Sequence, residues 1–417
     1  MKTFVARQPI FDRWQRVYAY ELLFRSGPES VLANVDAEHG DQASSKVIMT
    51  SLMSLDLETL VSDKKAFINV TRNLLLEGLV RVLPRRQTVI ELLETIEPDE
   101  EVVQVCHSLK RAGYHIALDD FQFTPAMEPL IETAEIIKVD FLESTPEERQ
   151  QYVDYFAPRG IRLLAEKVET QEEFQEAYQM GYSYFQGYFF CMPQFVSATD
   201  LPAYQTSYLK LLKELNQAEV DFDTLEDIVK HEFSLSYRLL RYINSVAMGL
   251  RAEVKSLKQA MALLGERLLR KWAILIALSG MSKEKPPELV VLSLVRARFC
   301  ELVGEKTRMD DFELELFLVG LFSTIDALVD QPLEEILDRI AVPELVSSTL
   351  LGDETPLSGS YALALAYERG DWEHVTYLAK EVGLSDAQTR EIYESAISWA
   401  DETFAIEVGS PVEEPGG

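Results

Sequence analysis

The chain has 417 residues, of which 47% are hydrophobic. It is therefore long enough for two domains of about 200 residues, each with a buried core. Its formal net charge of −29 argues against nucleic acid as the main partner, because phosphate backbones are bound by basic surfaces. An anionic substrate would need a bound cation in so acidic a protein. The cysteines show no metal-binding spacing and the apolar stretches are short, which favours a cytoplasmic location without membrane contact.

Short apolar runs alternate with longer amphipathic segments through about residue 195. The runs predict strands over residues 17–23, 66–69, 88–91, 115–119, 135–140, 161–166 and 182–186. The segments between them predict helices, for example over residues 100–111, 145–156 and 170–180. Alternation of strands and helices is typical of a parallel α/β fold, and the number of units suits a closed barrel.

The pattern changes after about residue 195, where only helical periodicity remains. Prolines such as Pro286, Pro332 and Pro343 mark boundaries between the predicted helices. The last residues are rich in Gly, Pro and Glu, which predicts a disordered tail. We therefore expect a barrel domain over residues 1–198, a helical domain over residues 199–405 and a tail over residues 406–417.

Polar side chains stand at the carboxyl ends of successive predicted strands. They are Glu21, Asn69, Glu91, Asp119, Asp120, Lys138, Glu166 and Gln186. The carboxyl ends of parallel strands meet at one mouth of a barrel, which is where barrel active sites lie. One charged residue in such a place is usually only a turn residue. A series of carboxylates would repel one another unless metal ions neutralised them.

Carboxylate and amide oxygens favour Mg²⁺ or Mn²⁺, whereas Zn²⁺ usually brings His or Cys ligands. None of the five histidines stands at these strand ends. The residues alone thus predict a barrel enzyme that depends on a divalent metal. They leave two reactions open, phosphoester hydrolysis and enolate chemistry, since both combine strand-end carboxylates with a lysine.

The order and spacing of these groups resemble the EAL phosphodiesterase family over about residues 4–195. The matching pieces are Glu21-Leu22-Leu23, Asn69, Glu91 with Glu94, Asp119-Asp120-Phe121, Lys138, Glu166 with Glu169, and Gln186-Gly187. The resemblance implies a TIM-like (β/α) barrel that hydrolyses the bacterial second messenger cyclic di-GMP to linear pGpG.

The same resemblance implies a role for each matching residue. Two metal ions, Mg²⁺ or Mn²⁺, would be held by Glu21, Asn69, Glu91, Asp119 and Asp120, with Glu166 contributing through water. Lys138 and Glu166 would serve catalysis. Substrate contacts would come from Gln8, Arg25, Glu169 and Gln186, and Glu94 would brace the loop after the Asp pair.

The chain departs from the family in that loop. Relatives show Gly-Thr-Gly after Asp-Asp-Phe, whereas this chain reads Gln122-Phe123-Thr124-Pro125. Without glycines we expect a stiffer loop along a different path, and no loop partner for Glu94. Lys167 also replaces a glycine after Glu166. The alternative to an active enzyme is therefore a cyclic di-GMP receptor that signals through the helical domain. A different metal-dependent barrel enzyme or a scaffold is the third hypothesis.

The second half resembles the HDOD module, an all-α domain. The matching pieces lie over residues 234–240, 242–245, 256–260 and 263–265. HDOD modules look like HD hydrolases without the metal-binding His-Asp pair, and His231 and His374 are the only histidines in this half. We therefore expect a regulatory domain without catalytic metal. Cyclic di-GMP is the expected ligand and nucleic acid is not, while a protein partner for this domain and a homodimer remain open.

Overall fold

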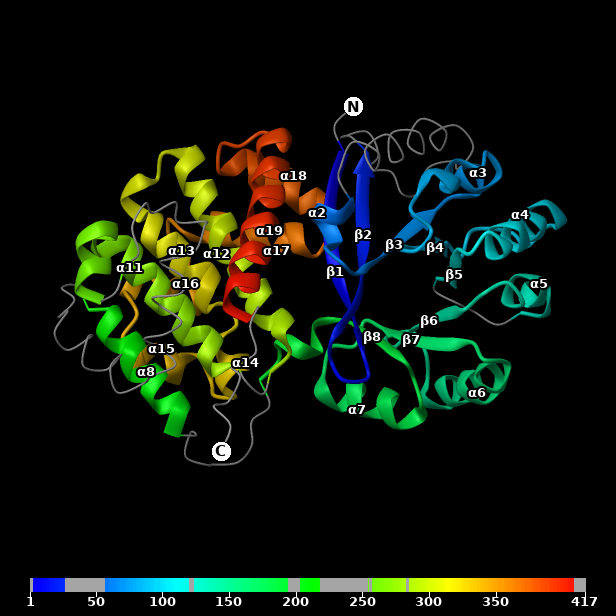
Figure 1. Cartoon of the computed structure of the whole chain (residues 1–417), viewed down its shortest axis with the longest axis horizontal. Coiled ribbons are helices and arrows are strands. Elements are labelled where there is room, and N and C mark those ends of the chain that lie inside the picture. Colours follow the sequence, from blue (N-terminus) through cyan, green and yellow to red (C-terminus); the bar gives the residue numbers. More distant parts are fainter. Residues whose placement is uncertain are drawn as a thin grey trace. The chain divides into compact units, whose positions relative to one another are not determined.

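The computed structural model describes residues 3–26, 57–119, 124–193, 203–217, 254, 257–282 and 285–408. The chain forms two compact units. The first comprises Met1–Met192 together with Ala366–Tyr377, and the second comprises Pro193–Leu365 with Leu378–Gly417. Figure 1 shows strands in the first unit, whereas the described elements between residues 203 and 408 are all helical.

The strands of the first unit close into a barrel in chain order. They are β1 (Thr3–Asp12), β2 (Val17–Ser26), β3 (Lys65–Val70), β4 (Thr88–Leu92), β5 (His115–Leu118), β6 (Ile136–Asp140), β7 (Arg162–Glu166) and β8 (Tyr184–Gln186). Neighbours from β2 to β8 are parallel, while β1 is antiparallel to both β2 and β8. The predicted TIM-like barrel is thereby confirmed. The sequence pattern does not predict β1, because Arg7-Gln8-Pro9 interrupts its apolar run.

Helices connect the parallel strands on the outside of the barrel (Figure 1). They are α2 (Leu57–Val61), α3 (Arg72–Leu76), α4 (Glu100–Arg111), α5 (Glu128–Ile131), α6 (Pro146–Phe156) and α7 (Gln171–Met180). Capping boxes begin α6 at Thr145 and α7 at Thr170, each with a glutamate three residues later. These side chains satisfy backbone donors that a helix start leaves unpaired, which explains why the two helices begin where they do.

One buried side chain from each strand forms a layer across the barrel interior. The layer consists of Ile10, Ala19, Phe67, Val89, Ala117, Ile136, Leu164 and Tyr184. Because every second residue of a strand points to the same side, the next inward layer lies two residues further along each parallel strand. On the antiparallel strand β1 it lies two residues earlier. That next layer stands at the carboxyl ends of the parallel strands.

The described residues after position 202 form helices and no strand, as the HDOD resemblance implies. The helices are α8 (Ala203–Leu215), α11 (Leu257–Met281), α12 (Pro287–Thr307), α13 (Glu313–Phe322), α14 (Ile325–Val329), α15 (Leu333–Arg339), α16 (Glu344–Leu350), α17 (Ser358–Glu368), α18 (Trp372–Glu381) and α19 (Asp386–Val408). Helices α12, α15 and α16 each begin directly after a proline, which cannot donate a backbone hydrogen bond and suits a helix start. Helix α12 packs against α13 and α19.

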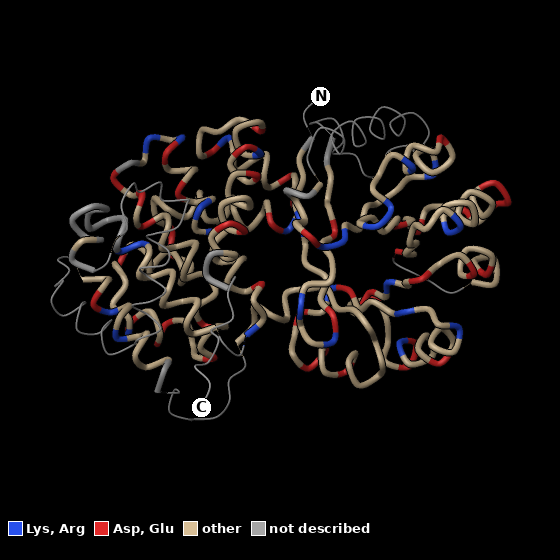
Figure 2. The backbone as a smooth tube through the Cα atoms, viewed as in Figure 1, with Lys and Arg blue, Asp and Glu red and all other residues tan. Residues whose placement is uncertain are grey.

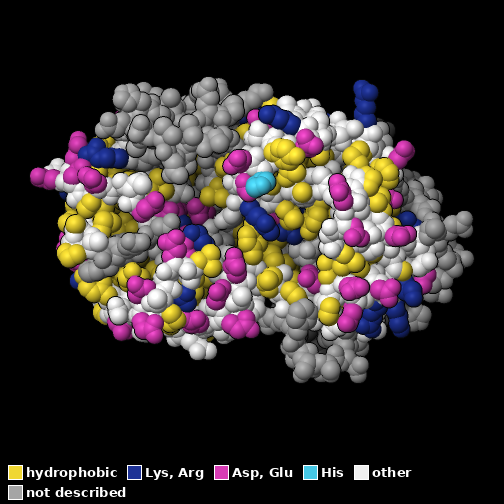
Figure 3. All heavy atoms as spheres, turned by 180° about the vertical axis from the view of Figure 1, so that it is seen from behind, with side chains coloured by type: hydrophobic (Ala, Val, Ile, Leu, Met, Phe, Trp, Pro, Cys, Tyr) yellow, Lys and Arg dark blue, Asp and Glu magenta, His cyan; other side chains and the backbone are white. Residues whose placement is uncertain are grey.

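Acidic residues are distributed along the elements of both units in the backbone view (Figure 2). On the face drawn in Figure 3, Asp and Glu side chains are likewise spread over the described surface and form no single patch. Within the described residues, no helix is both long enough and apolar enough to cross a lipid bilayer.

Candidate active site

The layer above the apolar barrel core is polar on every strand. It consists of Gln8, Glu21, Asn69, Glu91, Asp119, Lys138, Glu166 and Gln186, each two residues from its partner in the apolar layer. Strand register aligns neighbours directly: Gln8 pairs with Glu21 across β1 and β2, and Asn69 pairs with Glu91 across β3 and β4. The structure thus brings together most of the residues that the sequence predicts for the site.

Lys138 lies at the centre of this polar layer. Only 1% of its side chain is exposed, and its ammonium nitrogen lies 2.9 Å from Oδ1 of Asp119 and 2.5 Å from Oε1 of Glu166. The same nitrogen lies 3.4 Å from Oε2 of Glu21 and also contacts Glu91. One ammonium group cannot balance four buried or half-buried carboxylates. The site therefore carries an excess of negative charge that a bound cation would offset.

Burial and mutual repulsion change the proton affinity of these groups. Burial raises the pKa of Glu91 well above its usual value, and the charge of Glu21 adds to the effect. Burial also raises the pKa of Glu166 to about 8, against the opposing attraction of Lys138. Burial alone would lower the pKa of Lys138, but the surrounding carboxylates outweigh it and raise that pKa well above the usual value.

Three buried oxygens of the polar layer accept no hydrogen bond from the described residues: Asn69 Oδ1, Glu91 Oε2 and Gln186 Oε1. Buried acceptors are rarely left without a donor in folded proteins. Glu21, Glu91 and Glu166 each offer a carboxylate oxygen, and these oxygens lie within 4.8 Å of one another. These carboxylate and amide oxygens are hard metal ligands, so the residues fit a hard divalent cation such as Mg²⁺ or Mn²⁺.

Two amide side chains, Asn69 and Gln186, orient the Glu21 carboxylate through hydrogen bonds. Gln186 Nε2 donates to Glu21 Oε2 at 2.8 Å and to Gln8 Oε1 at 3.2 Å. The Asn69 amide donates to Glu21 Oε1 at 3.0 Å. Both oxygens of Glu21 are therefore oriented by neighbouring amides, which fixes this carboxylate before any ligand binds.

A pocket of about 370 Å³ opens above the polar layer. Its lining consists of Gln8, Glu21, Leu23, Asp119, Lys138, Leu142, Glu166, Lys167, Glu169, Gln186, Gly187, Tyr188 and Arg369. Arg369 was not predicted as a site residue, because nothing in its local sequence connects it with the strand-end motifs. Only the folded chain reveals its position in the pocket.

Lys167 has an unusual backbone conformation at the pocket. Its φ is 53°, in the left-handed region that glycine tolerates best. Its ammonium group is ion-paired with Asp140, and about half of the Lys167 side chain is exposed. Burial would raise the pKa of Asp140, but the Lys167 contact and the backbone N–H of Leu142 outweigh it and lower that pKa.

Several predicted residues lie partly or wholly outside the described part of the chain. The backbone of Arg25 pairs with Phe4, but its side chain is not described, and neither is Asp120. Only Thr124 and Pro125 of the altered loop are described, so its predicted path remains a prediction. Glu94 is exposed and makes no hydrogen bond or ion pair with a described residue. The HDOD-like pieces over residues 234–245 also lie outside the description, together with His231.

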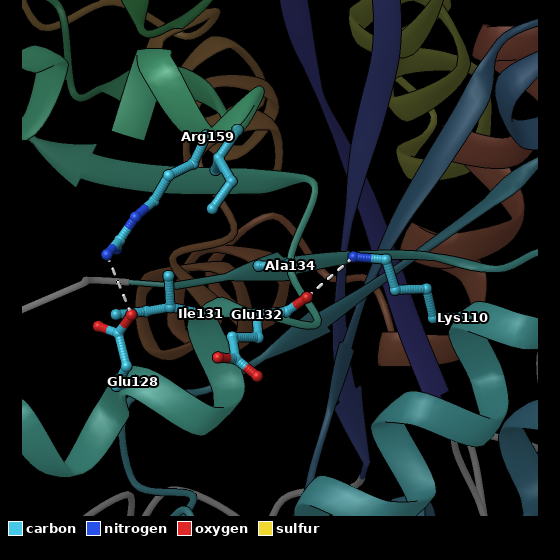
Figure 4. Close-up of a pocket in the computed structure, with 7 residues that line it drawn as sticks. Lys110, Glu128, Ile131, Glu132, Ala134 and Arg159 are labelled. Atoms are coloured by element: carbon cyan, nitrogen blue, oxygen red, sulfur yellow. Dashed lines mark hydrogen bonds and ion pairs between the residues drawn. The ribbon is translucent and has the colours of Figure 1, made fainter. Parts of the chain in front are cut away.

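A second pocket in the barrel, of about 310 Å³, lacks comparable chemistry (Figure 4). Arg159 Nη2 lies 3.2 Å from Glu128 Oε1, and Lys110 Nζ donates to the backbone oxygen of Glu132 at 3.1 Å. Arg159, Glu128 and Lys110 of this pocket therefore already pair with protein atoms. It provides matched control positions for the active-site residues.

One carboxylate cluster in the helical part also has the geometry to hold a metal: Glu301, Glu305 and Glu313. Lys271 contacts Glu301 and lies 3.0 Å from Glu313, while Arg298 lies 2.5 Å from Glu301 and 3.3 Å from Glu305. Each of the three carboxylates therefore already pairs with a protein cation, Lys271 or Arg298.

Two family models match this chain. Residues 4–193 match the model of the EAL domain, and residues 201–335 match that of the HDOD domain. YuxH of Bacillus subtilis (strain 168), which its name calls uncharacterized, is 34% identical over 407 residues, covering 96% of this chain and 98% of YuxH. The chain belongs to the EAL–HDOD family.

A second relative of this EAL–HDOD protein has a name that states an enzymatic activity. Cyclic di-GMP phosphodiesterase CdgJ of Vibrio cholerae serotype O1 is 33% identical over 403 residues, covering 96% of this chain and 93% of CdgJ. Among solved structures, a standalone EAL protein from Vibrio cholerae O395 in its c-di-GMP-bound form is 22% identical. The matched region covers 46% of this chain and 93% of the Vibrio cholerae chain, and the TM-score is 0.37.

Proposed function

We propose that this EAL–HDOD protein hydrolyses cyclic di-GMP to linear pGpG with Mg²⁺ or Mn²⁺. One observation carries the proposal: each of the eight strands, or the residue directly after it, contributes a polar side chain to one buried or half-buried layer. Three buried oxygens of that layer lack hydrogen-bond donors among the described residues. The similarity to CdgJ over nearly the whole chain supports the choice of substrate.

The proposed metal ligands are those that the family resemblance implies. Glu21, Asn69, Glu91 and Asp119 would hold one ion, and Asp119, Asp120 and, through water, Glu166 would hold a second. Bound divalent cations supply Lewis-acid stabilisation of the charge that develops at phosphorus. They would also offset the excess of carboxylates around Lys138, which otherwise opposes the approach of an anionic dinucleotide.

The chain's own residues would do the remaining work. Lys138 would orient the attacking water and counter negative charge on the phosphoryl oxygens, since its buried ammonium group already faces the cluster. Glu166 would accept the proton of that water on a carboxylate oxygen. Gln8, Arg25, Glu169 and Gln186 would contact the nucleotide.

We also propose the domain boundaries 1–198 and 199–405; the two family matches cover residues 4–193 and 201–335 within them. The helical domain would regulate the barrel or bind a protein partner. It would contain no catalytic metal, because its two histidines are too few for an HD-type centre. A cytoplasmic location and a homodimer belong to the same proposal.

The test uses the purified full chain with cyclic di-GMP and either Mg²⁺ or Mn²⁺. The expected product is pGpG, identified by liquid chromatography and mass spectrometry. Glu21→Gln should abolish turnover because it removes a ligand and keeps the side-chain shape. Glu128→Gln makes the same change in the second pocket and should leave turnover intact. Equal turnover by both variants would refute the assignment of this centre.

A second candidate is a cyclic di-GMP receptor without turnover. The exposed Glu94, which bonds to no described residue, favours it, since the family resemblance gives that residue a bracing role. Turnover of cyclic di-GMP by the parent protein decides between the two, because a receptor binds the nucleotide and returns it intact. Glu94→Ala tests the brace: where the brace is unused, the variant should bind cyclic di-GMP like the parent protein, and any turnover should change less than about twofold. A large loss of turnover would restore the bracing role and remove the support for the receptor.

A further inference from the structure

The turn between α17 and α18 reaches the proposed catalytic pocket. Its residues belong to Ala366–Tyr377, the segment that forms one compact unit with the barrel strands. Arg369 of this turn lines the same pocket as Lys138 and Glu166. The turn lies outside both ranges matched by the family models, residues 4–193 and 201–335.

Aromatic packing anchors the turn to the first barrel strand. Phe4 of β1 is 3% exposed, and its ring centroid lies 5.6 Å from that of Trp372 and 6.2 Å from that of Tyr367. Trp372 and Tyr367 also contact each other edge to face at 5.3 Å. Such aromatic contacts combine buried apolar area with defined geometry, so both ends of the turn are held.

Gly370 allows the turn to come close to the strands. Its φ is +68°, and a Cβ atom there would lie 2.7 Å from Cδ1 of Leu23 on β2. Only glycine meets both conditions without a shift in the backbone or in Leu23. Beside it, Gln8 Nε2 donates a long hydrogen bond to the backbone oxygen of Arg369 at 3.5 Å. Arg369 is thereby placed next to a predicted substrate-binding residue.

Arg369 is the one cation in the described lining of this pocket for which no ion pair with a carboxylate is found. Among the described residues that line the pocket, Lys138 is surrounded by carboxylates and Lys167 is paired with Asp140. Arg369 is exposed and forms no ion pair with a described residue. Its guanidinium carbon lies 5.8 Å from the centroid of the Tyr188 ring, which also lines the pocket.

We propose that Arg369 is a substrate-binding residue, which donates paired hydrogen bonds to a phosphate of the cyclic dinucleotide. This inference rests on the proposed function and extends it beyond the EAL and HDOD modules. Guanidinium groups bind phosphate oxygens through two parallel N–H donors, and charge assistance strengthens each bond. The neighbouring Tyr188 ring would hold the guanidinium plane in place.

The experiment compares Arg369→Ala, Arg369→Lys and Arg159→Ala with the parent full-length protein. Steady-state kinetics with cyclic di-GMP and Mn²⁺ give KM and kcat, and thermal unfolding verifies that each variant is folded. Arg369→Ala should raise KM about 10- to 100-fold, the loss expected for charge-assisted hydrogen bonds, with kcat nearly unchanged. Arg369→Lys should recover part of the loss. Arg159→Ala, in the second pocket, should match the parent.

A further variant tests the placement of the turn. Gly370→Ala keeps the guanidinium group but strains the positive φ and crowds the Leu23 side chain, so the turn should shift, and KM should rise while kcat is spared. If the parent protein turns over cyclic di-GMP and Arg369→Ala leaves KM unchanged, this inference is wrong and the proposed function stands. If the parent neither binds nor hydrolyses cyclic di-GMP, both proposals fail.

Discussion

The ammonium nitrogen of Lys138 lies 2.9 Å from Oδ1 of Asp119, although Lys138 lies within one barrel strand and Asp119 just past the end of the preceding one. Lys138 is on β6, and Asp119 follows the last residue of β5. Their contact joins the proposed metal ligands to the proposed catalytic lysine. Substitution of the lysine should therefore affect the chemical step more than substrate binding.

We expect Lys138→Ala to lower kcat by about 10²- to 10³-fold, the usual effect of removing one group that stabilises transition-state charge. KM should stay within a few-fold, because the lysine is buried at the base of the pocket and would act mainly at the transition state. Steady-state kinetics on cyclic di-GMP measure both parameters. Lys110→Ala, a lysine of the second pocket, is the control. A variant with unchanged kcat and a greatly raised KM would assign Lys138 to binding.

The raised pKa values of Glu91 and Glu166 predict a link between pH and metal binding. Both groups hold protons more tightly in the folded than in the unfolded chain, so their contribution to stability is lost as pH rises above the usual glutamate value of 4.5 toward about 8. Metal ions displace these protons, so their stabilising effect should increase over the same interval. Thermal unfolding with and without Mn²⁺, at several pH values, measures that increase. A metal-induced rise in Tm that is constant or shrinks with pH would contradict it.

Lys167 allows a test of backbone strain at the pocket. Lys167→Gly and Lys167→Ala both lose the ion pair with Asp140, but only glycine relieves the positive φ. We expect Lys167→Ala to be less stable than Lys167→Gly by about 1 kcal/mol, the usual penalty of the left-handed conformation. Urea unfolding of the two variants gives the difference directly. Equal stability would show that the backbone at this position carries no strain.

The helical part should bind no catalytic metal. Lys271 and Arg298 already pair with the carboxylates of the Glu301 cluster, so Glu301→Gln should leave the number of Mn²⁺ ions bound per chain unchanged. Glu21→Gln should reduce it. Equilibrium dialysis followed by elemental analysis of the full chain counts the ions. A loss of bound metal in Glu301→Gln would mean that this cluster is a metal site.

Much of the barrel could be predicted because its strands are short and buried. Period-two spacing sets each polar side chain two residues beyond an apolar one, so Glu91 and Glu166 are visible in the sequence as carboxylates at the ends of apolar runs. The sequence pattern does not predict strand β1, because Arg7 and Gln8 interrupt its apolar run. Its antiparallel direction is what places Gln8 beside Glu21.

Arg369 could not be predicted from the sequence for a different reason. Its place in the pocket depends on packing between Phe4 and the far-off residues Tyr367 and Trp372. No local pattern encodes a contact between residues so distant in the chain. The positive φ of Lys167 could not be predicted from its own side chain either. The only indication of it is that the family has glycine at this position.

The most direct test of the account is a single-turnover reaction in heavy-oxygen water. Excess full-length protein with Mn²⁺ is mixed with cyclic di-GMP, and mass spectrometry follows the nucleotide. The account predicts pGpG with one heavy oxygen in its terminal phosphate, and no product from Glu21→Gln. Recovery of intact, bound cyclic di-GMP from the parent protein would contradict hydrolysis at the polar layer around Lys138.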